Sequence, residues 1–390
     1  MKLLERLKDV GGVIGMSEGK TTRKYTIFPF GPQHPVLPEP IQLRFMVDEE
    51  KIVDVGVNVG YVHRGIERAC ELNDYQRNVY LCERVCGICN FMHALCYCMA
   101  LEKLVDVEVP ERAQYLRVIW AELNRLESHL LWLGLLADAM GFESLFMQFW
   151  RDREIVMDLQ ERTGGNRVII STCVVGGVRR DISGQLAEHF KESMLELKRR
   201  MDKLAPVILK DSAFKKRTVG KGFLSYDDAL KLGAVGPTAR GSGVAKDIRL
   251  EGYQAYKHLK FEPVVEKDGD VYARTLVRFY EVYQAIDLIL EAFKIMPEGK
   301  IAVKPEKWPE GEAVARVEQP RGELFYYVKG NGTNKLERVK IRTPTLANIP
   351  SLLAMLPGYE VADIPVIVLS IDPCIACTER IINIRKDGRS

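Results

Sequence analysis

The chain has 390 residues, of which 47% are hydrophobic and 28% charged, and its formal net charge is +3. This composition is ample for a large buried core and excludes disorder for most of the chain. Lysines and arginines are dispersed along the sequence, so we expect no nucleic-acid partner. Because no low-complexity stretch divides the chain, we expect one large globular unit with subregions.

The first 24 residues read as an N-terminal extension. Residues 1–20 alternate charges with short apolar runs and lack the continuous apolar core of a signal peptide. No window approaches the roughly 20 consecutive apolar residues that a membrane-crossing helix needs, and the longest apolar run is residues 364–371. We therefore expect a cytoplasmic protein that attaches to a membrane only through partner subunits.

The remaining chain, residues 25–380, predicts an α+β fold that is predominantly helical. Residues 25–63 alternate apolar and polar side chains around a proline-rich turn at 32–40, which predicts a small antiparallel sheet. Between residues 64 and 300 apolar residues recur at three- and four-residue intervals, which predicts a core of long bundled helices. The predicted helices cover residues 64–85, 94–104, 110–139, 144–163, 181–204 and 271–293.

Residues 301–380 are expected to form a mixed region. A strand-like run lies at 323–328, and the apolar run at 364–371 suits either a buried strand or a short buried helix. Residues 372–380 follow this run abruptly, which places the last cysteines at the end of an interior element. A polar tail at 381–390 completes the chain.

Two Cys-x-x-Cys pairs stand out among the nine cysteines, Cys86 with Cys89 and Cys374 with Cys377. Without an export signal, a disulfide framework is not expected. Each pair can present two thiolates to one ion, and four soft thiolates suit zinc, iron–sulfur or nickel. The spacing alone leaves a structural zinc site open. The other cysteines have apolar neighbours and are expected to be ordinary buried residues: Cys70, Cys82, Cys96, Cys98 and Cys173.

The flanks of the two pairs favour chemistry over a zinc staple. We expect the first pair to end a long helix and the second to follow the apolar run, so that both lie deep in the protein. Zinc ribbons usually hold their pairs in exposed polar knuckles. A buried site is better suited to chemistry.

The motifs RVCGICNFMHAL at residues 84–95 and DPCIACTER at 372–380 resemble the two metal-binding signatures of nickel–iron hydrogenase large subunits. Further matches extend the resemblance over nearly the whole chain: GPQHP at 31–35, ELNRLESHLL at 122–131, GGVRRD at 176–181, GPTARGSG at 236–243 and QPRGE at 319–323. Several internal motifs are also similar to the quinone-site subunit of respiratory complex I, which has lost the metal cysteines. Together they place the chain beside group 4 energy-converting, membrane-bound hydrogenases of the Ech, carbon-monoxide-linked, formate-linked and archaeal types.

The resemblance implies a nickel–iron centre whose iron carries cyanide and carbon monoxide. Cys86 and Cys374 would be terminal ligands on nickel, and Cys89 and Cys377 would bridge nickel to iron. A terminal thiolate such as Cys374 would be the first proton acceptor. His93, one helical turn after Cys89, would donate a hydrogen bond to a bridging sulfur. The chain has too few spare cysteines to hold an iron–sulfur cluster alone.

Three further residues receive roles from the resemblance. Glu39 matches the glutamate that passes protons to and from the site, although alone it reads as a surface turn residue. Arg321 matches the arginine above the open metal position, and without the family it would be a loop arginine. Asp372 would either order Arg321 or cap a helix that begins at Pro373.

Other positions carry weaker implications. Glu67 lies where some hydrogenases bind a structural magnesium. His34 matches a quinone-contacting histidine of the complex I relatives, but a packed structural histidine is the favoured reading. His129 and Arg125 are expected to serve helix packing and loop ordering. Family precursors are often cut after the residue matching Arg380, which would release the tail at 381–390.

The sequence therefore predicts the catalytic subunit of a reversible hydrogenase on the cytoplasmic side of the membrane. Its expected partners are an iron–sulfur small subunit, complex I-like peripheral and ion-translocating membrane subunits, and ferredoxin as electron donor. One rival is a metal-free coupling subunit of a sulfur-reducing or complex I-like respiratory complex. The other is a zinc-stapled structural subunit.

Overall fold

A computed structural model describes residues 25–378. The expected N-terminal extension, Arg380 and the tail at 381–390 lie outside the described residues. Among residues 25–378, no helix is long and apolar enough to span a membrane.

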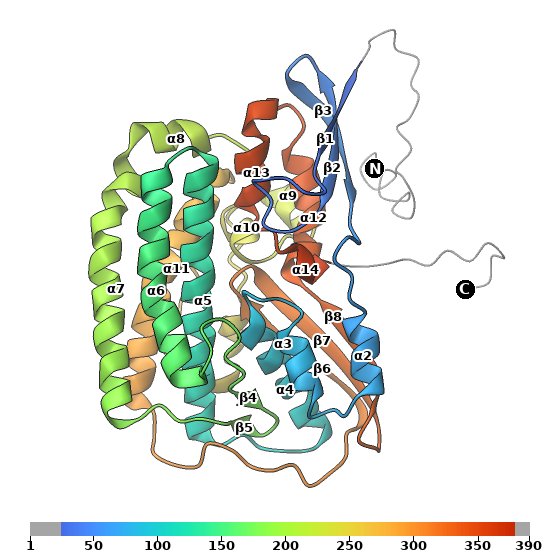
Figure 1. The fold of residues 1–390 in the computed structure, drawn as a ribbon, viewed down its shortest axis with the longest axis vertical. Coiled ribbons are helices and arrows are strands. Elements are labelled where there is room, and N and C mark those ends of the chain that lie inside the picture. Colours follow the sequence, from blue (N-terminus) through green and yellow to red (C-terminus); the bar gives the residue numbers. More distant parts are fainter. Residues whose placement is uncertain (1–24, 379–390) are drawn as a thin grey trace, which may run out of the picture.

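Four long helices form a bundle, on the left of Figure 1. They are α5 (Glu111–Ala139), α6 (Glu143–Gly164), α7 (Gly184–Lys210) and α11 (Val271–Ile295). Helix α5 packs against both α6 and α11, and most of its side chains are buried. Helix α7 instead buries one stripe, which includes Phe190, Met194 and Leu197, as an amphipathic outer helix does. The predicted helical core is confirmed.

The N-terminal sheet is also present, in the order β1-β2-β3 with antiparallel neighbours. Its strands are β1 (Thr26–Phe30), β2 (Gln42–Asp48) and β3 (Lys51–Asn58). In β2 the alternate residues Leu43, Phe45 and Val47 are buried, so one face of the sheet packs on the core. The loop between β1 and β2 carries His34 and Glu39.

A second antiparallel sheet, in the order β6-β7-β8, supports the other half of the molecule. Its strands are β6 (Glu310–Gln319), β7 (Gly322–Asn331) and β8 (Leu336–Arg342). Helix α4 (Asn90–Leu104) packs on β6 and β7, and α2 (Ile66–Leu72) packs on β8. Only the centre of β7 reads as a strand in sequence. The pattern in β6 is weak because its inward positions include the small residues Ala313 and Ala315.

The single helix expected at residues 64–85 is wrong. The structure has α2 and then α3 (Asn78–Glu83), separated by a turn. The Asp74 carboxylate accepts hydrogen bonds from the backbone N–H groups of Gln76 (2.8 Å) and Arg77 (3.3 Å), which stabilises the turn against the helix. The first cysteine pair therefore follows a short helix rather than a long one.

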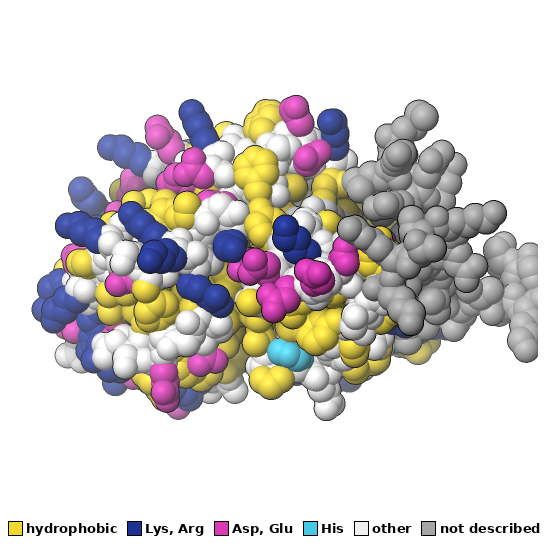
Figure 2. All heavy atoms as spheres, turned by 90° about the horizontal axis from the view of Figure 1, so that it is seen from above, with side chains coloured by type: hydrophobic (Ala, Val, Ile, Leu, Met, Phe, Trp, Pro, Cys, Tyr) yellow, Lys and Arg dark blue, Asp and Glu magenta, His cyan; other side chains and the backbone are white. Residues whose placement is uncertain are grey.

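The apolar run at 364–371 forms a helix, α13 (Ile364–Ser370), so the helical alternative is correct. The smaller elements are β4 (Cys173–Val174), β5 (Gly177–Val178), α8 (Ser212–Thr218), α9 (Tyr226–Lys231), α10 (Gly236–Arg240), α12 (Pro344–Met355) and α14 (Ile375–Thr378). The face seen in Figure 2 mixes basic, acidic and hydrophobic side chains.

Candidate metal centre

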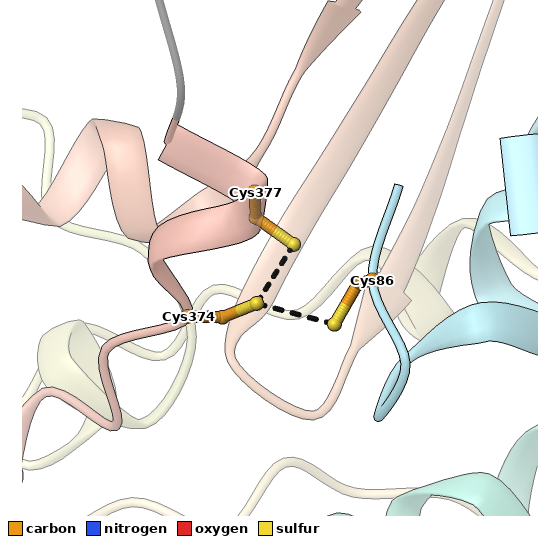
Figure 3. Close-up of side chains that lie close together, drawn as sticks. All are labelled: Cys86, Cys374 and Cys377. Atoms are coloured by element: carbon orange, nitrogen blue, oxygen red, sulfur yellow. Dashed lines mark hydrogen bonds between the residues drawn. The ribbon is translucent and has the colours of Figure 1, made fainter. Parts of the chain in front are cut away.

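Two loops from distant parts of the chain bring four cysteines together. The first lies between α3 and α4, and the second runs from the end of α13 into α14. The sulfur atoms of Cys86 and Cys374 are 3.1 Å apart, those of Cys374 and Cys377 3.1 Å, and those of Cys89 and Cys377 3.8 Å. Figure 3 shows three of these side chains pointing toward one another. These four residues, the thiol cluster, are at most 2% exposed.

Side chains outside the first loop fix its backbone. The Arg64 guanidinium donates to the carbonyls of Arg84 (2.7 Å) and Val85 (2.8 Å) at the entrance to the loop. From α5, the Asn124 amide donates to the Ile88 carbonyl at 2.6 Å. The loop is thus tied to the core of the bundle.

The second loop is held by the residues that begin α12. The Thr343 hydroxyl donates to the Cys377 carbonyl at 2.7 Å, and the Thr345 hydroxyl accepts from the Cys374 N–H at 3.3 Å. The Trp132 indole of α5 donates to the Leu369 carbonyl at 2.6 Å, which fixes the end of α13. Both loops are therefore anchored to α5.

The four thiols do not share their acidity equally. Hydrogen bonds from the neighbouring thiols of Cys374, Cys377 and Cys89 hold the pKa of Cys86 well below its usual range. Burial raises the pKa of both Cys89 and Cys377. The pKa of Cys86 thus shifts in the direction opposite to those of Cys89 and Cys377. A metal ion bound by all four sulfurs would displace the remaining protons, which is the usual behaviour of thiolate sites.

His93 lies behind the cluster, with its Nε2 3.6 Å from the Cys377 sulfur. Its Nδ1 is 2.8 Å from the hydroxyl of Tyr326. Burial lowers the pKa of His93 to about 4, so the ring is neutral near pH 7. One ring nitrogen then donates and the other accepts.

Arg321 lies beside the cluster and is ordered by Asp372. Its Nε donates to the Asp372 carbonyl and its Nη2 to the Asp372 carboxylate, both at 2.8 Å, while Nη1 donates to the Ser128 hydroxyl at 3.1 Å. Burial alone would lower the pKa of Arg321, but Asp372 and the cluster thiols raise it well above its usual value. The guanidinium is thus a permanent charge close enough to interact electrostatically with the cluster thiols.

The turn that carries Arg321 contacts the loop before α10 without a gap. A Cβ added to Gly236 would lie 2.3 Å from the Arg321 carbonyl oxygen and 2.5 Å from the Gly322 Cα. Gly236 also has φ of 64°, which favours glycine. The GPTARGSG motif therefore serves as a close-fitting support for this turn.

Glu39 reaches the cluster from the β1–β2 loop. Its carboxylate accepts a hydrogen bond of 2.7 Å from the Ala376 N–H at the start of α14. This N-terminal amide of the helix is therefore bonded by Glu39, and not by Asp372 as the capping alternative predicted. Burial, and then the negative charge of Cys86, raise the pKa of Glu39. Its side chain remains partly exposed. It thus lies between the sulfurs and the surface.

The weaker candidates lie farther from the sulfurs. The Glu67 carboxylate faces Arg338 (3.1 Å) and Lys340 (3.6 Å), and these cations disfavour the magnesium prediction, which stays untested. His34 stacks on Phe30 with ring centroids 3.9 Å apart, and its Nδ1 accepts from the Val36 N–H at 3.3 Å. These contacts suit the packing role.

His129 and Arg125 belong to a larger buried ion network beside the site. The network consists of Glu122, Arg125, His129, Arg240, Asp247, Arg249, Glu281 and Glu318, all at most 3% exposed. Arg240 donates to Glu281 at 2.6 Å and to Glu318 at 2.7 Å, and the His129 Nε2 lies 2.7 Å from Glu281. The network fixes α10, α11 and β6 to α5.

Sequence reasoning missed several residues that shape the site. Asn124 and Ser128 are four positions apart and therefore share one face of α5, a signal that could have been read from the ELNRLESHLL motif. Thr343 and Thr345 had no such signal, because an isolated threonine before a helix reads only as a cap. Tyr326 appeared as one more apolar position of a strand.

A buried set of four thiols, a guanidinium beside them and a carboxylate toward the surface form a site that could hold a metal ion. Comparison with known proteins agrees. The family model described as respiratory-chain NADH dehydrogenase, 49 Kd subunit, matches residues 139–308 and 301–380, and that described as nickel-dependent hydrogenase matches residues 64–140. The chain therefore belongs to the family that joins hydrogenase large subunits with this complex I subunit.

Individual relatives support the assignment over most of their length. The carbon monoxide-induced hydrogenase of Rhodospirillum rubrum is 44% identical, over 91% of this chain and 99% of that protein. The membrane-bound hydrogenase subunit alpha of Pyrococcus furiosus is 39% identical, over 95% and 91%. A chain in the solved structure of the membrane-bound sulfane sulfur reductase, an archaeal respiratory membrane complex, is 33% identical and superposes with a TM-score of 0.87 over 91% and 98%.

Proposed function

We propose that this chain is the catalytic subunit of a membrane-associated hydrogenase that interconverts two protons and two electrons with H2. The observation that carries the proposal is the convergence of four buried thiols within 3.1–3.8 Å of their neighbours. Four soft sulfur donors fit a nickel–iron centre. When bound, that centre would supply the two-electron redox chemistry of hydrogen.

The sulfur arrangement also supports the proposed ligand roles. The first cysteines of the two motifs, Cys86 and Cys374, are close to each other, and so are the second cysteines, Cys89 and Cys377. This pairing suits two terminal thiolates on nickel and two that bridge to iron. Cyanide and carbon monoxide on the iron, which no side chain supplies, belong to the same proposal.

The surrounding residues would manage protons and charge. Cys374, 3.1 Å from Cys86, is the proposed thiolate that first accepts a proton. Glu39, with a raised pKa and partial exposure, would carry protons between the thiol cluster and solvent. Arg321 would hold a fixed positive charge beside the sulfurs, with Asp372 keeping it in place. Polar and permanently charged groups thus surround a site from which the fold excludes bulk water.

The proposal includes the partners that the resemblance to energy-converting hydrogenases implies. Electrons would come from ferredoxin through an iron–sulfur small subunit, and membrane subunits would couple the reaction to ion translocation. The chain itself would be a peripheral subunit on the cytoplasmic side. Magnesium at Glu67 is not included, because basic side chains face that carboxylate.

A second function is a metal-free coupling subunit of a sulfur-reducing complex. The similarity to a chain of the sulfane sulfur reductase structure favours it. The four intact cysteines weigh against it, because a coupling role alone does not require thiolates. A zinc-stapled subunit would use the same sulfurs but would require neither Glu39 nor Arg321.

The deciding experiment is metal analysis of the purified complex, together with infrared spectroscopy in the cyanide and carbon monoxide stretching region. Stoichiometric nickel and iron with those bands are expected. Zinc alone, or no metal and no bands, would reject the hydrogenase in favour of a scaffold or coupling subunit.

Glu39→Gln tests the proton relay separately. The amide keeps the shape of the carboxylate but cannot carry a proton, so H2 evolution should be lost while nickel and iron are retained. Glu50→Gln, at an exposed glutamate, is the matched control and should keep full activity. Normal turnover in the Glu39 variant would remove this residue from the relay.

A further inference from the structure

A row of buried side chains leads from the second sheet to the thiol cluster. Tyr326 of β7 places its hydroxyl 2.8 Å from the Nδ1 of His93, and the Nε2 of the same ring lies 3.6 Å from the Cys377 sulfur. Tyr326 and His93 are both fully buried. We propose that Tyr326 is a positioning residue that selects the His93 tautomer whose Nε2–H donates a hydrogen bond to the Cys377 sulfur. This inference rests on the proposed thiolate metal centre.

The donor-to-acceptor direction of the hydrogen bonds in this row follows from which atoms carry a hydrogen. A neutral imidazole carries one N–H, so a hydrogen on Nε2 requires Nδ1 to accept. The Tyr326 hydroxyl, 2.8 Å away, is then the donor to Nδ1. Tyr326 to His93 and His93 to Cys377 form one consistent chain of donors.

The opposite direction leaves an unfavourable contact. If His93 carried its hydrogen on Nδ1, the Nε2 lone pair would face the sulfur of Cys377. A metal-bound thiolate has no hydrogen to offer, so two acceptors would lie 3.6 Å apart. In a fully buried position such a mismatch is unfavourable, because neither atom can turn to water for a hydrogen bond.

The fold keeps Tyr326 in one place. Strand β7 is the central strand of its sheet, and Tyr326 pairs with Ala315 on one side and Ile341 on the other. Its ring packs against Tyr97, which lies one turn after His93 on the same face of α4, with ring centroids 6.2 Å apart. The hydroxyl is therefore fixed before any metal binds.

The expected consequence is electronic. A hydrogen bond to a metal-bound thiolate withdraws electron density from the sulfur and raises the reduction potential of the centre. Without that bond, the sulfur donates more strongly to iron. Back-donation into carbon monoxide then increases and its stretching band moves to lower wavenumber.

The test compares Tyr326→Phe with Tyr97→Phe in the purified complex. Both variants remove one buried hydroxyl, but that of Tyr97 donates to the Tyr75 carbonyl at 2.8 Å and not to His93. The Tyr326 variant should keep nickel and iron, shift the carbon monoxide band to lower wavenumber and lower the reduction potential. The Tyr97 variant should leave both unchanged.

A double variant isolates the route. If Tyr326 acts through His93, then Tyr326→Phe should add no further shift in a His93→Gln background. A carbon monoxide band unchanged by Tyr326→Phe, or a shift that persists in the His93→Gln background, would overturn the inference.

Should Tyr326→Phe fail to assemble, 3-fluorotyrosine at position 326 preserves the shape of the side chain and makes its hydroxyl a stronger hydrogen-bond donor. It should move the band to higher wavenumber, and no movement would again overturn the inference.

Failure of the proposed function would look different. A wild-type complex without nickel or infrared bands would reject the nickel–iron centre itself. Cobalt(II) added to wild-type and Tyr326→Phe complexes would then report the same hydrogen bond through the sulfur-to-cobalt charge-transfer band. A move to longer wavelength in the variant would retain the inference, whereas identical bands would reject it.

Discussion

The thiol cluster and the buried ion network are both removed from water, but they balance charge differently. In the network, guanidinium groups alternate with carboxylates, as where Arg240 lies between Glu281 and Glu318. In the cluster, four thiols adjoin one guanidinium, that of Arg321, which is already paired with Asp372. In the network each guanidinium is paired with carboxylates of the same chain. The cluster has more sulfur ligand atoms than one guanidinium can balance, which is typical of a site that binds a metal cation.

This difference predicts that the two regions respond to different substitutions. Changes in the cluster should affect metal content and turnover, whereas changes in the network should affect folding stability.

Cys89→Ala should have the largest effect, because it removes one of the four sulfurs. Nickel and iron in the purified complex should fall to background, and H2 evolution should disappear with them. Cys98→Ala is the matched control, since Cys98 is equally buried in α4 but lies outside the cluster. Metal loss in both variants would mean that folding rather than ligation explains the result.

Arg240→Met tests the network. It leaves Glu281 and Glu318 buried without their partner, which typically costs about 3–5 kcal/mol. Denaturant unfolding should show this loss, and the complex that remains folded should keep its nickel. Arg167→Met removes a partly exposed arginine that pairs with Asp158 and should cost much less stability than Arg240→Met. Equal costs for the two variants would contradict the contrast between buried and surface pairs.

Gly236→Ala tests the contact between the α10 loop and the Arg321 turn. The added methyl would overlap the Arg321 carbonyl, so Arg321 should be displaced, with slower H2 evolution and a stability loss of about 1–3 kcal/mol beyond the strain of positive φ. Gly233→Ala is the control, because its φ of 67° is similar and no atom lies within 4 Å of the new Cβ. Similar turnover in the two variants would show that this contact does not position Arg321.

His129 gives a smaller, pH-dependent effect. Burial lowers the pKa of His129 to about 4. The nearby Glu281 carboxylate acts to raise this pKa, whereas the positive charges of Arg125 and Arg278 lower it further. Between about pH 6.5 and 4 the unfolded chain therefore binds more protons, so this contribution to stability is present above pH 6.5 and is lost on acidification. From about pH 7 to 5.5 the loss should be about 1 kcal/mol.

To test this, the melting temperature is measured against pH in the wild type and in His129→Gln, whose side-chain amide can still donate to Glu281. This variant should lose less stability on acidification than the wild type. The exposed His258 provides the control, and His258→Gln should follow the wild-type curve. Parallel curves for all three proteins would exclude His129 as the titrating group.

The sequence predicted those parts of the fold and site that depend on local pattern. The long helices α5 and α11 repeat apolar residues over many turns. The Cys-x-x-Cys spacing of the two cysteine pairs is likewise visible in the sequence itself. The break between α2 and α3 was missed because one aspartate, Asp74, outweighs an otherwise helical pattern. A short-range side-chain bond of this kind leaves little trace in periodicity.

The remaining parts of the site depend on contacts between distant segments. Tyr326 contacts His93 from 233 positions away, and Glu39 contacts Ala376 from 337 positions away. Nothing in the residues around Tyr326 distinguishes it from a packing tyrosine. Such partners emerge only when the sheets, the bundle and the two loops are placed in space.

The order of the described elements also sets the timing of biosynthesis. Cys374 and Cys377 follow every sheet and every long helix, and α14 rests on the Glu39 carboxylate from the β1–β2 loop. A ribosome must therefore release nearly the whole described chain before the sulfur set is complete. A nascent chain that stalls early lacks two of the four sulfurs. Loading is then confined to a protein whose bundle and sheets have already had time to fold.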